Sequence, residues 1–154
     1  MDRLEEILEE RNKEYGNASV IGSKLLNLLP VLGSEHSHNF CLLVSKLARL
    51  SYNPIHHDSW LDIMGYAKLT RLGMVDNRTI YALPMYTKVT CDAMVSKVEE
   101  IIKGSNIDKH ALRVLYVSIV SKLVTSLYIP SNCKGHLLAI EQYASDALHW
   151  IDCL

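Results

Sequence analysis

A short pattern that occurs twice constrains the fold of this chain more than any other feature. Val-Ser-Lys-Leu at 44–47 recurs at 120–123, and in both copies a tyrosine and then a proline follow at the same spacing. Further along, Tyr66-Ala67 matches Tyr143-Ala144 after a slip of one residue. We therefore predict two related halves, residues 1–73 and 85–154, joined by a connection over 74–84 and packed as one domain with approximate two-fold symmetry. The alternative is that two unrelated helix–proline–helix segments simply look alike.

Apolar residues follow the period of an α-helix through nearly the whole chain, and signals for strands are nearly absent. The pattern predicts an all-α bundle of roughly seven helices that end at Gly or Pro residues. The expected helices cover residues 2–14, 18–32, a stretch from 34–39 to 52, 58–72, 85–103, 106–128 and 132–151. The helix at 106–128 is apolar around most of its circumference, so we expect it in the centre of the core or in a subunit interface.

Composition and charge exclude several classes of protein. The formal net charge is −1, so we expect no long-range attraction to nucleic acid or to an anionic membrane. The four cysteines lie far apart without CxxC spacing, which argues against zinc and a disulfide scaffold and favours free, buried thiols in a reducing cytoplasm. The first residues, MDRLEEILEE, are acidic and amphipathic, unlike a signal peptide, and no apolar run is long enough to span a membrane.

Polar residues with chemical potential concentrate in the helical hairpin over residues 44–69 and in the first helix. The candidate ligand-binding residues are Arg11, Tyr15, Lys46, Arg49, His57, Asp58, Asp62 and Tyr66. Arg11 shares the apolar face of the first helix with Leu4 and Leu8, while the glutamates point mostly the other way, so we expect Arg11 to face inward. For the adjacent His56 and His57 we expect capping or surface roles, with a His–Asp proton relay as the alternative.

The charges on the hairpin have three interpretations. In the first, Lys46 or Arg49 pairs with one of the aspartates across the hairpin and fixes its register. In the second, Asp58 and Asp62, which lie at i and i+4 of a helix, hold Mg²⁺ and act as catalytic residues against a phosphoanhydride. In this second case Mg²⁺ is the cofactor; otherwise none is required.

In the third interpretation, the cations hold a phosphate group. Arg11, Lys46 and Arg49 would grip the phosphate, because the planar guanidinium suits it bidentately. The aspartates would accept from base or ribose donors, and a ring would stack on the base. The rings available for stacking are Tyr15, Trp60 and Tyr66.

Three segments, ILEERNKEYGN, LLVSKLARL and HHDSWLDIMGYAKL, resemble a small all-α domain family of bacteriophages and prophages that has no settled function. The family pattern is ERxxxYG, then LKxAR, then DxWxDxxGYA, and the resemblance covers residues 4–70. The residues that carry it are Arg11, Tyr15, Gly16, Lys46, Ala48, Arg49, Asp58, Trp60, Asp62, Gly65, Tyr66 and Ala67. That family is in turn distantly similar to the MazG-type all-α nucleotide pyrophosphohydrolases, which use carboxylate-bound Mg²⁺.

The resemblance implies a protein that handles nucleotides in the cytoplasm of an infected host cell. The chain lacks a clear inward ExxE paired with a later ExxD, so it departs from the MazG-type enzyme pattern. We therefore expect binding of a nucleotide or another phosphate-bearing small molecule, with a role in sequestering a nucleotide signal during counter-defence. The alternatives are Mg²⁺-dependent nucleotide pyrophosphohydrolysis and a non-catalytic helical protein-interaction module. We expect a homo-oligomer.

Overall fold

A computed structural model describes residues 2–15, 18–28, 37–74, 87–107, 109–128 and 133–154. Within these residues it contains helices and no strand, so the prediction of an all-α bundle is confirmed. The described helices are α1 (Arg3–Tyr15), α2 (Ala18–Leu28), α3 (Ser37–Tyr52), α4 (His57–Gly73), α5 (Lys88–Ile102), α6 (His110–Tyr128) and α7 (Cys133–Asp152). In this part of the chain no helix is both long and apolar enough to cross a membrane.

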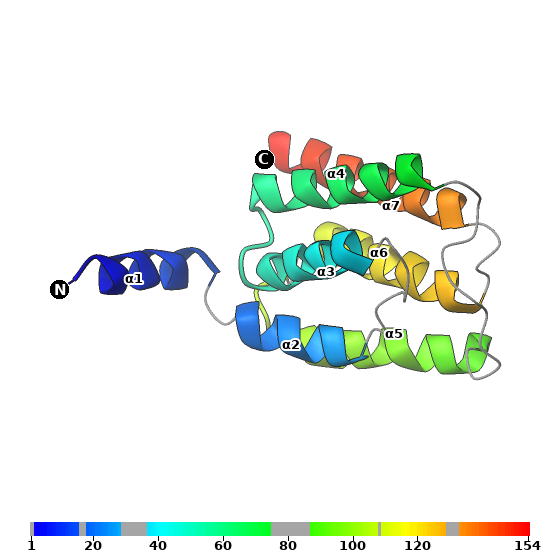
Figure 1. Ribbon diagram of the computed structural model, residues 1–154, viewed down its shortest axis with the longest axis horizontal. Coiled ribbons are helices and arrows are strands. Elements are labelled where there is room, and N and C mark those ends of the chain that lie inside the picture. Colours follow the sequence, from blue (N-terminus) through cyan, green and yellow to red (C-terminus); the bar gives the residue numbers. More distant parts are fainter. Residues whose placement is uncertain (1, 16–17, 29–36, 75–86, 108, 129–132) are drawn as a thin grey trace.

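Six of these helices form the bundle, in two sets of three (Figure 1). In the first set α3 packs between α2 and α4, and in the second α6 packs between α5 and α7. The sets meet most extensively where α4 packs on α7, and again where α2 packs on α5. In contrast, α1 projects away from the bundle, at the blue end of the ribbon (Figure 1).

Burial follows the same pattern in the two sets. The buried positions of α3 recur in α6, where Phe40, Leu43, Val44, Leu47, Ala48 and Leu50 correspond in order to Tyr116, Ile119, Val120, Leu123, Val124 and Ser126. With the one-residue slip, the buried positions of α4 recur in α7, where Ser59, Trp60, Ile63, Ala67 and Thr70 correspond to His136, Leu137, Ile140, Ala144 and Ala147. Each set therefore buries equivalent faces, and the duplication itself stays a prediction.

The turn between α3 and α4 is held by the backbone and by one indole. Asn53 N–H donates to the carbonyl of Arg49, and His56 N–H donates to the carbonyl of Asn53. Trp60 is fully buried, and its Nε1 donates to the carbonyl oxygen of Pro54 at 2.8 Å. Trp60 therefore belongs to the core, and the suggestion that its ring stacks on a base is wrong.

The start of α6 differs from the prediction. We predicted a helix from residue 106, but α6 begins at His110 because the preceding residues are engaged elsewhere. The Asn106 N–H donates to the carbonyl of Ser51 at 2.9 Å, and its side-chain amide donates to the carbonyl of Tyr52 at 2.6 Å. Asn106 thus satisfies carbonyls that the end of α3 leaves without a helical partner, and it ties the second half to the first.

Other predicted boundaries agree with the structure to within a few residues wherever the chain is described. The end predicted for the second helix at residue 32 and the start of the fifth at 85 lie outside the described residues, as does all of the predicted connection over 74–84 except Met74. The broadly apolar helix is in fact central, because α6 packs on both α5 and α7. An interaction module that exposes this helix is therefore not favoured.

Candidate functional site

The hairpin of α3 and α4 brings one predicted cation and one predicted carboxylate together. Lys46 on α3 lies 3.0 Å (Nζ–Oδ2) from Asp62 on α4. The side chain of Lys46 is 13% exposed and that of Asp62 is 41% exposed, so the pair is only partly shielded from water. One of the ion pairs that the sequence predicts across the hairpin therefore forms, and it neutralises both groups locally.

The second carboxylate of the predicted Mg²⁺ site, Asp58, lies one turn before Asp62 and is exposed. Among the described residues, no three His, Cys, Asp or Glu side chains gather as metal ligands. Two carboxylates alone can still hold Mg²⁺ when substrate phosphates complete the shell. In this geometry, however, the ammonium of Lys46 occupies one side of Asp62 and competes with a cation there.

Arg49 lines a groove between α2 and α3 with a volume of about 290 Å³. The hydroxyl-bearing residues Ser19 and Ser23 of α2 and Ser45 of α3 line the same groove. The two helices approach closely here, since Gly22 has no side chain. A Cβ added at Gly22 would lie 3.4 Å from the Cβ of Ala48. A guanidinium beside several hydroxyls in a narrow groove can bind an oxyanion.

The serines of this groove were not singled out from the sequence. Ser19 and Ser23 lie one helical turn apart on α2, and Ser45 lies one turn before Arg49 on α3, so each is in phase with the groove. That spacing is a usable signal only once α2 is known to pack on α3. A search confined to charged residues and rings passes over them.

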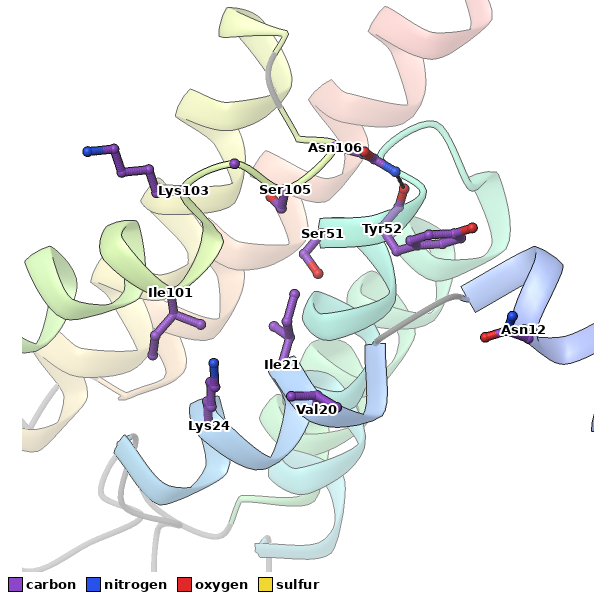
Figure 2. Close-up of a pocket in the computed structure, with 11 residues that line it drawn as sticks. Asn12, Val20, Ile21, Lys24, Ser51, Tyr52, Ile101, Lys103, Ser105 and Asn106 are labelled. Atoms are coloured by element: carbon purple, nitrogen blue, oxygen red, sulfur yellow. Dashed lines mark hydrogen bonds between the residues drawn. The ribbon is translucent and has the colours of Figure 1, made fainter.

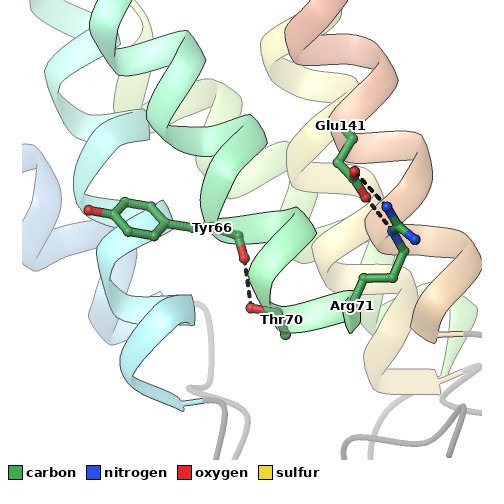
Figure 3. Close-up of polar contacts among 4 residues, drawn as sticks. All are labelled: Tyr66, Thr70, Arg71 and Glu141. Carbon is green, nitrogen blue, oxygen red and sulfur yellow. Dashed lines mark hydrogen bonds and ion pairs between the residues drawn. The ribbon is translucent and has the colours of Figure 1, made fainter. Parts of the chain in front are cut away.

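Tyr66 lies on α4 beside the Lys46–Asp62 pair. It borders a shallow hollow of about 380 Å³, which is also lined by Asp62, Gly65 and Lys68. The carbonyl of Tyr66 accepts a hydrogen bond from the Thr70 hydroxyl at 2.8 Å, and its half-buried ring points away from α7 (Figure 3). Tyr66 and Asp62 are therefore brought together, as the sequence predicts.

His57 is placed at the other side of α4. Its Nε2 lies 3.8 Å from Oδ1 of Asp152 at the end of α7, and both side chains are at least half exposed. Neighbouring His56 occupies the N-cap position of α4, and its Nδ1 lies 2.7 Å from the hydroxyl of Ser59. His57 therefore lies at the surface, as expected, while His56 holds the N-cap position without a side-chain capping hydrogen bond.

The two predicted residues of α1 lie apart from this group. Arg11 is exposed, and the face that it shares with Leu4 and Leu8 is not buried, since these leucines are 64% and 53% exposed. The expectation that Arg11 faces inward is therefore wrong for this structure, because α1 has no bundle surface beneath it (Figure 1). Tyr15 is the last residue of α1, and its side chain lies outside what the structure describes.

An ion pair that the sequence did not predict joins the two halves. Nε of Arg71 on α4 donates to Oε2 of Glu141 on α7 at 2.6 Å, and Nη2 donates to Oε1 at 3.0 Å (Figure 3). The hydrogen bond to Glu141 and the charge of its carboxylate raise the pKa of Arg71. This two-pronged pair fixes the α4–α7 contact and leaves neither group available for a ligand.

Residues 1–72 match the family model of a domain of unknown function, DUF6378. The match covers α1 to α3 and nearly all of α4, so every predicted site residue falls inside it. A comparison with curated proteins found no match to the chain, and a comparison with solved structures found none either.

Proposed function

We propose that this chain binds a nucleotide, or another phosphate-bearing small molecule, and holds it without cleaving it. The observation that carries the proposal is Arg49 in the α2–α3 groove, beside the hydroxyl-bearing residues Ser19, Ser23 and Ser45. An arginine fork binds two phosphate oxygens at once, and the hydroxyls of Ser19 and Ser45 can donate to the others, whereas the Ser23 hydroxyl donates to the carbonyl of Ser19 at 3.0 Å.

The surroundings of the Asp58 and Asp62 carboxylates support binding without hydrolysis. A pyrophosphohydrolase needs acidic groups that are free to hold Mg²⁺ and activate water. Asp62 is engaged by Lys46 at 3.0 Å, and Asp58 faces solvent. The Lys46–Asp62 pair is better suited to orient groups around a bound ligand than to hold a metal ion.

The biological setting rests on the resemblance to phage and prophage domains. A protein of this kind in the cytoplasm of an infected cell would sequester a nucleotide signal and so blunt a host defence. Sequestration needs affinity and slow release rather than turnover, which agrees with an Arg-lined groove. A homo-oligomer would add to such capture by presenting several sites at once.

The test is capture and recovery of nucleotides. The protein is mixed with a nucleotide panel, separated from free ligand and heat-denatured, and the released ligand is identified by mass spectrometry. We expect one nucleotide to be retained and released unchanged, and we expect Arg49→Ala to abolish its capture. Arg49→Lys, which keeps the charge but loses the fork, should weaken capture, and Arg3→Ala on the exposed α1 should leave it unchanged. A panel that yields no retained ligand would refute the proposal.

The Mg²⁺-dependent pyrophosphohydrolase remains the second candidate, because Asp58 and Asp62 lie one turn apart on α4. It predicts time-dependent loss of a nucleotide that EDTA prevents and that Asp62→Asn abolishes. Recovery of intact nucleotide after long incubation with Mg²⁺ would exclude it.

A further inference from the structure

A separate hollow of about 580 Å³ lies where the first half meets the second (Figure 2). Its walls come from α2, the end of α3, the end of α5 and the segment that follows α5, and one residue of α1 borders it. The lining residues are Asn12, Val20, Ile21, Lys24, Ser51, Tyr52, Ile101, Lys103, Gly104, Ser105 and Asn106. Its volume is in the range of small-molecule sites, roughly 300–1,000 Å³.

The charge of this lining is entirely positive. Lys24 and Lys103 line it, and none of the other lining residues carries a carboxylate. Neither lysine forms an ion pair within the described residues. Figure 2 shows the ammonium of Lys24 directed from α2 toward the α5–α6 connection, while Lys103 stands at the rim with its head turned outward. Because the lysine stem is flexible, Lys103 can swing over a bound anion.

One hydroxyl in the hollow has no partner. The Ser105 Oγ is buried, and it forms no hydrogen bond with any described residue. Buried polar groups are nearly always hydrogen-bonded, so this atom indicates a missing acceptor or donor. By contrast, the nearby Ser51 hydroxyl donates to the carbonyl of Ala48 at 2.5 Å, and the side-chain amide of Asn106 is engaged by Tyr52.

The wall that carries Ser105 is fixed before any ligand arrives. Ser105 N–H donates to the carbonyl of Ile102, and Asn106 N–H donates to that of Ser51, both at 2.9 Å. Gly104 has a φ of 78°, a conformation that suits glycine, and it allows the chain to turn sharply out of α5. A ligand held by such a wall needs little ordering of the backbone.

We propose that this hollow is a second anion site, which binds the phosphate group of a small, polar, phosphorylated molecule. Lys24 and Lys103 supply the charge, and the mostly polar wall accommodates the rest of the molecule. The Ser105 hydroxyl, buried and without a partner before binding, turns into the hollow and donates a hydrogen bond to a phosphate oxygen. The site goes beyond the function proposed above, because it shares no residue with the Arg49 groove. Since its walls come from both halves, the ligand links them and stabilises the fold.

The test uses pyrophosphate and ribose 5-phosphate as probes, each against sodium chloride at matched ionic strength. Binding is measured by calorimetry and by the shift in the thermal midpoint, in an Arg49→Ala background that removes the first site. We expect saturable binding of at least one probe and a rise of the midpoint. Replacing Lys24 and Lys103 together by Gln should weaken binding by about tenfold or more, because two charge-assisted contacts are lost. Ser105→Ala should weaken it less.

Lys97→Gln is the matched control, since this lysine lies on α5 outside the hollow and is largely exposed. Both lysines of the hollow are also exposed, so circular dichroism should show the double variant folded. Binding that persists unchanged in the double variant would overturn the proposal. Loss of all probe binding on Arg49→Ala alone would also overturn it while leaving the proposed function standing. If nucleotide capture failed while pyrophosphate still bound the hollow, the proposed function would be refuted and the second site would stand.

Discussion

At the scale of single residues, Tyr116 connects the central helices of the two halves. Its ring is fully buried on α6, and its hydroxyl donates to the carbonyl oxygen of Leu47 on α3 at 2.8 Å. Burial raises the pKa of this phenol above its ordinary value, so the hydroxyl stays neutral and remains a donor through the physiological range. This hydrogen bond therefore joins the two central helices.

Removing this hydroxyl gives a prediction with a defined pH dependence. Tyr116→Phe should lower the free energy of unfolding at pH 7 by about 0.5–1.5 kcal/mol. In the wild type the unfolded tyrosine ionises near pH 10 while the folded one does not, so stability is lost as pH rises above about 10. The variant lacks this group, and its loss of stability there should be shallower by about 1.4 kcal/mol per pH unit. Urea denaturation from pH 7 to 11 measures both effects, and parallel curves above pH 10 would contradict the assignment.

Residue by residue, the site was predictable where one hairpin decides it. Lys46 and Asp62 belong to neighbouring helices joined by a short turn, so periodicity indicates that a cation of one helix can pair with an aspartate of the other, and the structure shows which pair forms. The prediction that Arg11 faces inward was wrong, because periodicity shows which residues share a face but not whether anything packs on that face. The hollow with Lys24 and Ser105 could not be found this way, because its walls come from segments that only the tertiary fold brings together.

At the scale of elements, the contact of α4 with α7 is the largest between the halves, and the Arg71–Glu141 pair is built into it. The side chains are only 24% and 12% exposed, and the geometry is two-pronged. Breaking a shielded pair leaves one charge without its partner, which costs more than the pair itself contributes.

Glu141→Gln should therefore lower the thermal midpoint by several degrees, whereas Glu100→Gln should leave it nearly unchanged. The control removes the exposed Lys97–Glu100 pair, whose side chains are 67% and 73% exposed. Replacing both members, by Arg71→Met with Glu141→Leu, should restore part of the loss, because an apolar pair of similar volume fills the contact. Thermal unfolding followed by circular dichroism is the measurement. A double variant less stable than either single one would show that the pair acts through more than its charges.

For helix α1 we predict no effect on stability. Leu4 and Leu8 are mostly exposed, so replacing both by Ser should leave the thermal midpoint of the bundle within about a degree, since surface changes rarely matter more. Leu47→Ala in the core of α3 should lower the free energy of unfolding by about 2–5 kcal/mol and so clearly lower the thermal midpoint. A clear drop for the α1 variant would mean that this face is covered, as in the homo-oligomer that the sequence leads us to expect. Sedimentation of the wild type and of the α1 variant, each at two concentrations, would then show the homo-oligomer.

The elements themselves were the most predictable part of the fold. A period of 3.6 in the apolar residues predicts the helices of the bundle, because each of these helices buries one face against its neighbours. The exception is the start of α6, where Asn106 bonds to the end of α3 and Ile107 is fully buried without being helical. Ile107 is apolar like most of the helix that follows it, so only the tertiary contact reveals that the helix starts later.

At the scale of the whole molecule, the two halves are too strongly linked to be independent units. The α4–α7 and α2–α5 contacts, the Tyr116 hydroxyl and the bonds from Asn106 to α3 all run between them. A three-helix half that is separated from the other would expose the apolar faces that these contacts bury. The bundle should therefore unfold in one cooperative step, as single domains of this size usually do.

Each half carries its own reporter of unfolding. Trp60 is fully buried in the first half, and Trp150→Phe leaves it as the only tryptophan of the chain. Cys91 and Cys133 are buried in the second half, and burial also raises the pKa of Cys91, so both should react with a thiol reagent only after unfolding. Replacing the more accessible Cys41 and Cys153 by Ser removes their background.

In this combined variant, Trp60 fluorescence and pulsed thiol labelling should report the same midpoint in urea. The two midpoints coincide if separating α4 from α7 exposes apolar surface in both halves at once, because neither half can then stay folded alone. Nucleotide or pyrophosphate binding should move the two midpoints together, since a ligand of the folded state stabilises the whole cooperative unit. If labelling of Cys91 and Cys133 preceded the loss of Trp60 fluorescence, the second half would open by itself. The two halves would then have separate stabilities in spite of their shared core.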